Sequence, residues 1–224
     1  MRMLFAATLA GTFLGASAAG AITQSFTGSV GPTSLGFGAT SVVPAISQFN
    51  PALGNLTGIN VHFDGLLEGF DHLESLDSQP STVTSNYSSI VTLLRNVTVL
   101  GSVTPLQIFT DQFSAYDGSN NSGGTSGASH DGLSISSSFD LTPSDSSPYV
   151  GTGTVPFSVS ASVNNSISGT PSFTSSILNN ETGTVTVTYT YDLIPAMVPV
   201  PEPVSMALLG AGLAGLLMIR RTRA

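Results

Sequence analysis

The stretch Thr182-Gly-Thr-Val-Thr-Val-Thr-Tyr-Thr-Tyr191 alternates between two kinds of side chain. Valine and tyrosine occupy the odd positions from 185 to 191, and threonine occupies the even positions from 184 to 190. A period of two is typical of a β-strand with one face toward a core and the other toward solvent. This stretch therefore predicts a half-buried strand, and the segments before it are interpreted in relation to it.

Shorter segments of similar character precede it, separated by turn signals such as Asn50-Pro51-Ala52-Leu53-Gly54. We expect strands at residues 24–30, 41–49, 56–64, 82–94, 97–103, 133–141, 153–163 and 172–178. Residues 66–76 fit helical spacing and strand alternation alike, and we interpret them as a strand because their neighbours are strands. Residues 117–131, rich in Gly, Ser and Asn, predict a loop. The pattern predicts an all-β domain over residues 22–194, an antiparallel β-sandwich of jelly-roll or immunoglobulin-like type.

The charge balance excludes some classes of partner. The chain of 224 residues has no lysine, and twelve of its thirteen acids lie between Asp64 and Asp192. Arg95 is the only basic residue in that region, so its formal charge is −11. Such a surface repels phosphate backbones, and we expect no nucleic-acid binding. The absence of cysteine excludes disulfides, a thiol nucleophile and an acylated cysteine.

The N-terminus has the features of a secretory signal peptide. Arg2 precedes a short apolar run at residues 3–14, and Ala16-Ser17-Ala18 and Ala19-Gly20-Ala21 both fit a small-residue cleavage site. A first transmembrane helix is the competing interpretation, but the run is too short. We expect residues 1–21 to be the signal, so that the mature chain begins near Ala19 or Ile22 outside the cytoplasm.

The C-terminus predicts a membrane anchor. A proline-rich linker at residues 195–203 leads into sixteen uncharged residues, 204–219, and then into a basic end at residues 220–224. As a helix, the uncharged run would be about 24 Å long, which is short for a hydrocarbon core of ~30 Å. A buried helix of the domain is the alternative. We expect a single transmembrane helix that Arg220, Arg221 and Arg223 stop on the cytoplasmic side.

Pro201-Glu202-Pro203, the apolar run and the arginine-rich end together resemble the PEP-CTERM sorting signal. This resemblance implies recognition by an exosortase, cleavage near Pro201-Glu202-Pro203, and export by a Gram-negative bacterium. The protein would be anchored transiently in the inner membrane and then be at the cell surface or extracellular, associated with exopolysaccharide or biofilm. Glu202 is the only charge at this site, so we expect it to be the recognised group.

The body of the chain, residues 22–194, is similar to choice-of-anchor E domains. The similarity rests on four segments, residues 49–59, 123–127, 150–155 and 184–191. It implies a bacterial surface domain and carries no catalytic residues.

One ionisable cluster stands out in the domain, formed by Asp64, Glu68, Asp71 and Glu74 with other acids and His72 nearby. These oxygen ligands suit Ca²⁺, a carboxylate pair would suit glycoside hydrolysis, and a solvated strand face is the third interpretation. His130-Asp131 is adjacent to many serines, but no Gly-x-Ser-x-Gly nucleophile motif occurs. Tyrosines could stack on sugar rings, although the chain has no tryptophan.

We therefore expect a secreted, non-enzymatic surface or matrix protein without a cofactor, in a structural or adhesive role. The alternative is a calcium- or carbohydrate-binding surface module, and a glycan-acting hydrolase is a weaker third class.

Overall fold

The computed structural model describes residues 20–33, 40–194 and 211. The chain divides into two units, Met1–Leu193 and Ile194–Ala224. Apart from Gly20 and Ala21, the predicted signal peptide lies outside the described residues, and so does the predicted membrane helix at residues 204–219 except for the helical Ala211. Within the described part of the chain, no helix has the length and hydrophobicity to cross a bilayer.

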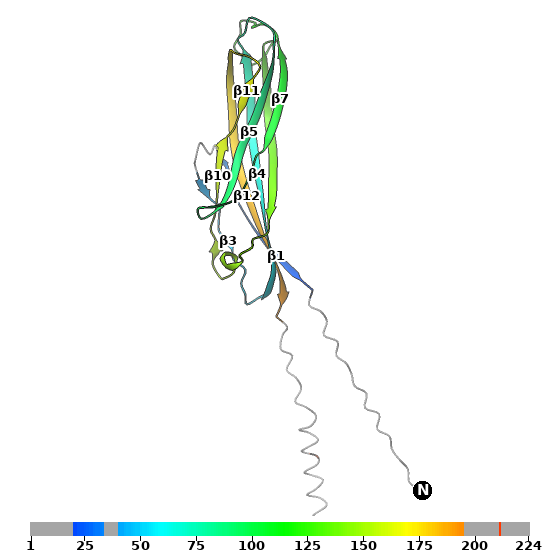
Figure 1. Ribbon diagram of the computed structural model, residues 1–224, viewed down its shortest axis with the longest axis vertical. Coiled ribbons are helices and arrows are strands. Elements are labelled where there is room, and N and C mark those ends of the chain that lie inside the picture. The colour runs from blue at the N-terminus through cyan, green and yellow to red at the C-terminus, as the bar shows by residue number, and fades with distance from the viewer. Residues whose placement is uncertain (1–19, 34–39, 195–210, 212–224) are drawn as a thin grey trace, which may run out of the picture. The chain divides into compact units, whose positions relative to one another are not determined.

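The first sheet contains the longest strands of the domain (Figure 1). Its order is β1 (Ile22–Thr33), β12 (Phe173–Leu193), β4 (Gly54–Ser75) and β8 (Gly127–Leu141), and every pair is antiparallel. At ~3.3 Å per residue, the 22 residues of β4 extend over roughly 70 Å. The first and the last strand of the domain are therefore neighbours, with Ile22 opposite Tyr191.

The second sheet is built around β5 (Ser81–Arg95). On one side β5 pairs with β10 (Phe157–Val163) and β11 (Ser166–Ser168), and β2 (Thr40–Val42) lies beyond β10. On the other side it pairs with β6 (Thr98–Val103) and β7 (Leu106–Phe113). A small sheet of β3 (Ile46–Ser47) and β9 (Thr154–Val155) and a 3₁₀ helix, η1 (Ser147–Tyr149), complete the domain. The predicted antiparallel β-sandwich is confirmed.

Several predicted elements are changed by the structure. Residues 56–64 and 66–76 form one continuous strand, β4, so the strand interpretation of 66–76 is correct. The predicted loop at 117–131 was wrong for residues 127–131, which belong to β8. Gly69 pairs with Leu133 and Asp71 pairs with His130, so β8 has one more residue than β4 in this interval. The resulting bulge contains Gly132, whose φ of 63° lies in the left-handed region. Strand β7 was not predicted.

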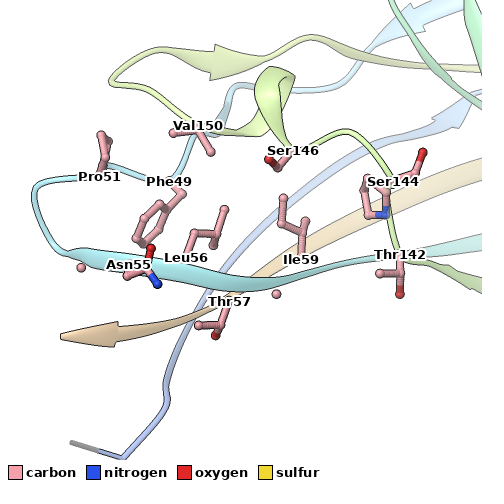
Figure 2. Close-up of a pocket in the computed structure, with 13 residues that line it drawn as sticks. Phe49, Pro51, Asn55, Leu56, Thr57, Ile59, Thr142, Ser144, Ser146 and Val150 are labelled. Atoms are coloured by element: carbon pink, nitrogen blue, oxygen red, sulfur yellow. The ribbon is translucent and has the colours of Figure 1, made fainter. Parts of the chain in front are cut away.

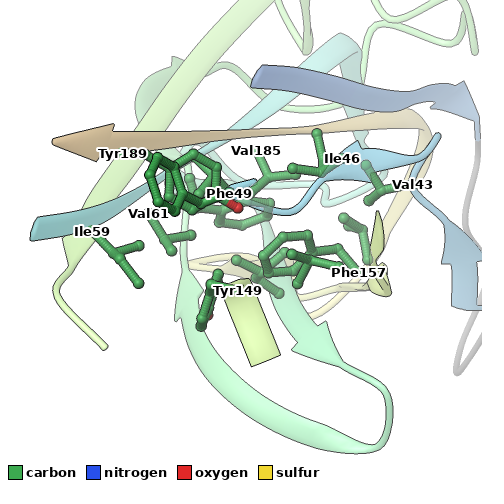
Figure 3. Close-up of a cluster of buried hydrophobic side chains, with 14 of the residues drawn as sticks. Val43, Ile46, Phe49, Ile59, Val61, Tyr149, Phe157, Val185 and Tyr189 are labelled. Carbon is green, nitrogen blue, oxygen red and sulfur yellow. The ribbon is translucent and has the colours of Figure 1, made fainter. Parts of the chain in front are cut away.

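The main core lies between the two sheets and is closed by the segment around β3 (Figure 3). Phe49 packs in it against Tyr189 and Tyr191, with ring centroids 5.8 and 5.1 Å apart. The valines predicted to face inward, Val185 and Val187, are fully buried. The alternation at 184–191 therefore identified the core face of β12 correctly.

A second and smaller apolar cluster consists of Leu73, Val83 and Phe113. Between the two clusters the interior is polar, with buried Asp71, Ser85, Ser89, Asn179 and Glu181.

Candidate functional site

A groove with a volume of about 450 Å³ lies where β4 begins (Figure 2). Its apolar lining comes from Phe49, Leu56, Ile59 and Val150 together with two prolines, Pro51 and Pro143. Asn55, Thr142, Ser144 and Ser146 are among the residues that supply its polar atoms. No ionisable side chain lines it, so the groove suits an uncharged ligand that presents both apolar and hydroxyl surface.

Two segments far apart in the sequence build this groove. Phe49 and Val150 form a parallel bridge, and the backbone N–H of Gly151 donates to the Phe49 carbonyl at 2.9 Å. Residues 49–59 and 150–155, two of the segments that resemble choice-of-anchor E domains, therefore meet in space. That resemblance itself stays a prediction.

A smaller groove of about 270 Å³ shares Thr142, Pro143 and Ser144 with the first one and contains Arg95. The Arg95 guanidinium lies 5.3 Å from the ring centroid of Tyr149. Hydrogen bonds from the backbone and side chain of Ser147 lower the pKa of Asp145 at the rim, and Arg95 adds to this effect. Arg95, the only Lys or Arg of the domain, is thus placed over the ring of Tyr149.

The four predicted metal ligands do not form one site. Asp64 and Glu68 are partly exposed, whereas Asp71 and Glu74 are fully buried. The Ser85 hydroxyl donates to Asp71 Oδ2 at 2.5 Å, and the Ser126 hydroxyl donates to Glu74 Oε1 at 2.5 Å. Among the described residues no three His, Asp or Glu side chains are grouped so that they could hold a metal ion.

Sequence reasoning missed a third buried carboxyl group, Glu181, to which the Ser89 hydroxyl donates at 2.6 Å. Asp71, Glu74 and Glu181 each keep one buried oxygen without a hydrogen-bond partner within the described part of the protein. Tyr87 lies near Asp71 and Glu181 and donates to the Leu178 carbonyl at 2.8 Å. Burial raises the pKa of Tyr87, and the charges of Glu181, Asp71 and Glu68 raise it further.

Each of the three histidines is paired with an aspartate, and in every pair one of the two residues lies on β8. His62 and His72 on β4 bond Asp140 and Asp131 at 3.1 and 2.8 Å, and His130 bonds Asp111 of β7 at 3.0 Å. The adjacent residues His130 and Asp131 have different partners because successive side chains of a strand point to opposite faces. The extra residue beside Gly132 sets the register that pairs His130, rather than Asp131, with Asp71. Ser85, which bonds Asp71, is fully buried. These pairs do not form a Ser-His-Asp triad.

The sorting residues Pro201, Glu202, Pro203, Arg220, Arg221 and Arg223 lie outside the described residues. All six belong to residues 199–223, and this segment matches the PEP-CTERM protein-sorting motif. The chain carries this signal, which implies processing by an exosortase.

No curated protein matches the sequence significantly. The solved structures it resembles include that of the infectious bursal disease virus Gx strain, at 8% identity over 80% of this chain and 38% of that one, with a TM-score of 0.24. Another is the T13 IBDV viral particle, at 12% identity over 90% of this chain and 47% of that one, with a TM-score of 0.18. The chain spans less than half the length of these structures, and likenesses this distant carry no functional argument.

Proposed function

We propose that this protein is a structural or adhesive component of the exopolysaccharide matrix of a Gram-negative bacterium, released from a transient inner-membrane anchor by exosortase. The match of residues 199–223 to the sorting motif carries the proposal, since it marks an exported, surface-directed chain. The folded domain ends at Leu193, ten residues before the apolar run begins at Val204. Cleavage near Pro201-Glu202-Pro203 would therefore leave the domain intact.

Intact mass spectrometry of surface-extracted protein tests this proposal, using cells with and without the exosortase. We expect the mature mass to lack residues 1–21 and the apolar tail in the parent strain, and to retain the tail in the strain without exosortase. Equal masses in both strains would refute the sorting step. Co-sedimentation with the cell's own exopolysaccharide then tests the matrix role separately.

A second candidate function is the binding of a neutral saccharide in the groove beside Ile59. The uncharged lining favours this class over both calcium and acidic sugars, because nothing in it would neutralise a charge. Titration calorimetry with neutral and uronic-acid oligosaccharides tests it. Ser146→Trp would fill the groove and abolish binding, whereas Ser138→Trp on the exposed face of β8 is the matched control.

We further propose that the domain needs no metal ion and has no catalytic activity. The serine hydroxyl partners of Asp71 and Glu74 support the first part, since these acids already have hydrogen bonds in the fold. The melting temperature should be the same in EDTA and in millimolar CaCl₂. A calcium-dependent increase that Asp71→Ala removes would favour the calcium-binding alternative instead.

A further inference from the structure

The first sheet has one edge that no other described strand covers. Residues 22–30 of β1 pair with β12 on one side, and among the described residues β12 is the only strand that pairs with β1. The opposite edge of this sheet, β8, is joined to β7 of the second sheet by the His130–Asp111 contact. The two edges of the sheet therefore differ, and the β1 edge keeps a row of backbone donors and acceptors available.

Residues 22–30 of this edge lack the usual protection against strand pairing, and Pro32 and the register irregularity of β1 lie beyond them. Natural edge strands carry charges, prolines or bulges that prevent association with another chain. Residues 22–30 contain no charged residue and no proline, and their pairing with β12 is regular until it shifts between Val30 and Thr33. The acids of the domain begin only at Asp64, so the like charges that would separate two copies are absent from this strand.

The sequence of the edge is self-complementary about Phe26. It reads Ile-Thr-Gln-Ser-Phe-Thr-Gly-Ser-Val, so that three of the four residue pairs equally distant from Phe26 match in character. In an antiparallel pair centred on Phe26, Ile22 would face Val30, Thr23 would face Ser29, and Ser25 would face Thr27. Gln24 would face Gly28, which has no side chain to clash with it. A twofold axis places residue i opposite residue j and residue j opposite residue i, so each compatible facing pair occurs twice in such an interface.

The side chains of β1 also favour an added strand. Ile22, Phe26 and Val30 pack against the core but remain partly exposed at this edge. A polar groove of about 310 Å³, lined by Gln24, Phe26 and Gln48 among others, lies beside them. On the outer face, Ser25 and Thr27 hydroxyls bond those of Thr188 and Thr186, both at 2.8 Å. A second copy would continue these hydroxyl rows across the new strand pair and cover the apolar side chains.

From these features we propose that the mature protein forms a twofold homodimer through β1, in which two four-stranded sheets join into one sheet of eight strands. Backbone hydrogen bonds would supply the affinity, and the pattern centred on Phe26 would set the register. This interface is independent of the saccharide groove and of the proposed matrix role.

Sedimentation velocity of the mature protein recovered from cells tests the dimer. The wild type should sediment at twice the chain mass at micromolar concentrations. The double variant Ser25→Lys/Thr27→Lys places a lysine opposite a lysine twice, and like charges directly opposite should raise the dissociation constant by about 2- to 30-fold. Both positions are exposed, so the fold should be retained and should give an unchanged circular dichroism spectrum.

Charge complementation makes the test specific. Mixing this variant with Ser25→Glu/Thr27→Glu should restore a heterodimer, because each lysine then faces a glutamate. The matched control Ser134→Lys/Ser136→Lys, on exposed positions of β8, should stay dimeric. A monomeric wild type would overturn the proposal, and so would a lysine variant that dimerises as well as the wild type.

Discussion

Gly65 on β4 lies directly opposite Gly183 on β12, and valines of the second sheet pack against both. A Cβ atom on Gly183 would lie 2.7 Å from Val159 Cγ1, and one on Gly65 would lie 2.5 Å from Val103 Cγ2. The two glycines thus allow the sheets to approach closely beside the polar part of the interior.

Gly183→Val should destabilise the domain by about 1–3 kcal/mol, because the added side chain must displace Val159 in a packed core. Urea unfolding followed by circular dichroism measures the loss. Gly58→Val is the matched control, since its Cβ would meet Thr190 at an ordinary 3.5 Å. Equal stability of the two variants would show that the sheets can separate without cost.

Ser89→Ala should lower the free energy of unfolding by about 1–3 kcal/mol, because it leaves both oxygens of the buried Glu181 without a partner. The double variant Ser89→Ala/Glu181→Leu should regain much of the loss, since it removes the polar group as well. Urea unfolding at pH 7 measures both. If the double variant is less stable than Ser89→Ala, Glu181 contributes through contacts other than Ser89.

The stability of the domain should fall at high pH because of Tyr189. Burial raises the pKa of Tyr189 to about 12 from 10.0, and the nearby Tyr149 adds to this effect. The folded state therefore holds the proton more tightly, so stability is complete below pH 10 and is lost between pH 10 and about 12. The expected slope is at most ~1.4 kcal/mol per pH unit for this group.

Urea unfolding at a series of pH values measures that slope. Tyr189→Phe should reduce the slope by the contribution of Tyr189, and the remaining slope comes from Tyr87, whose pKa is also raised by burial. The variant also loses the hydrogen bond to the Ser47 carbonyl, which lowers stability at pH 8. Tyr116→Phe, at an exposed tyrosine, controls for the loss of one ring hydroxyl. A slope unchanged in Tyr189→Phe would contradict the assignment.

Glu202→Ala should leave export intact and block processing, because it removes the only charge in Pro201-Glu202-Pro203. The measurement is the mass of the cell-associated protein, which should keep its apolar tail. Glu68→Ala, an acid of the domain, should be processed normally. Normal processing of Glu202→Ala would show that the prolines, rather than the charge, are recognised.

The fold was predictable where the alternation was strict, and the sites were not. Val185 to Tyr191 showed the core face of β12 because one face is apolar and the other is threonine. The acids from Asp64 to Glu74 are close in the sequence and looked like one cluster. Alternation along β4 places Asp71 on the opposite face from Asp64 and Glu68, and residues near Ser126 cover Glu74. The register shift at Gly132 has no clear signal in the sequence, so it could not be predicted that His130, rather than Asp131, points toward Asp111 of the second sheet. The groove depends on contact between Phe49 and Val150, a hundred residues apart, which periodicity cannot show.

The position of β12 between β1 and β4 also determines when the domain can fold. β1 is the first strand of the domain to be synthesised, but its partner residues 183–191 are among the last. Until then neither β1 nor β4 has its main neighbour, and the first sheet cannot assemble. The sandwich therefore closes only after nearly the whole domain is available, and the sorting signal at residues 199–223 follows its last strand closely in the sequence.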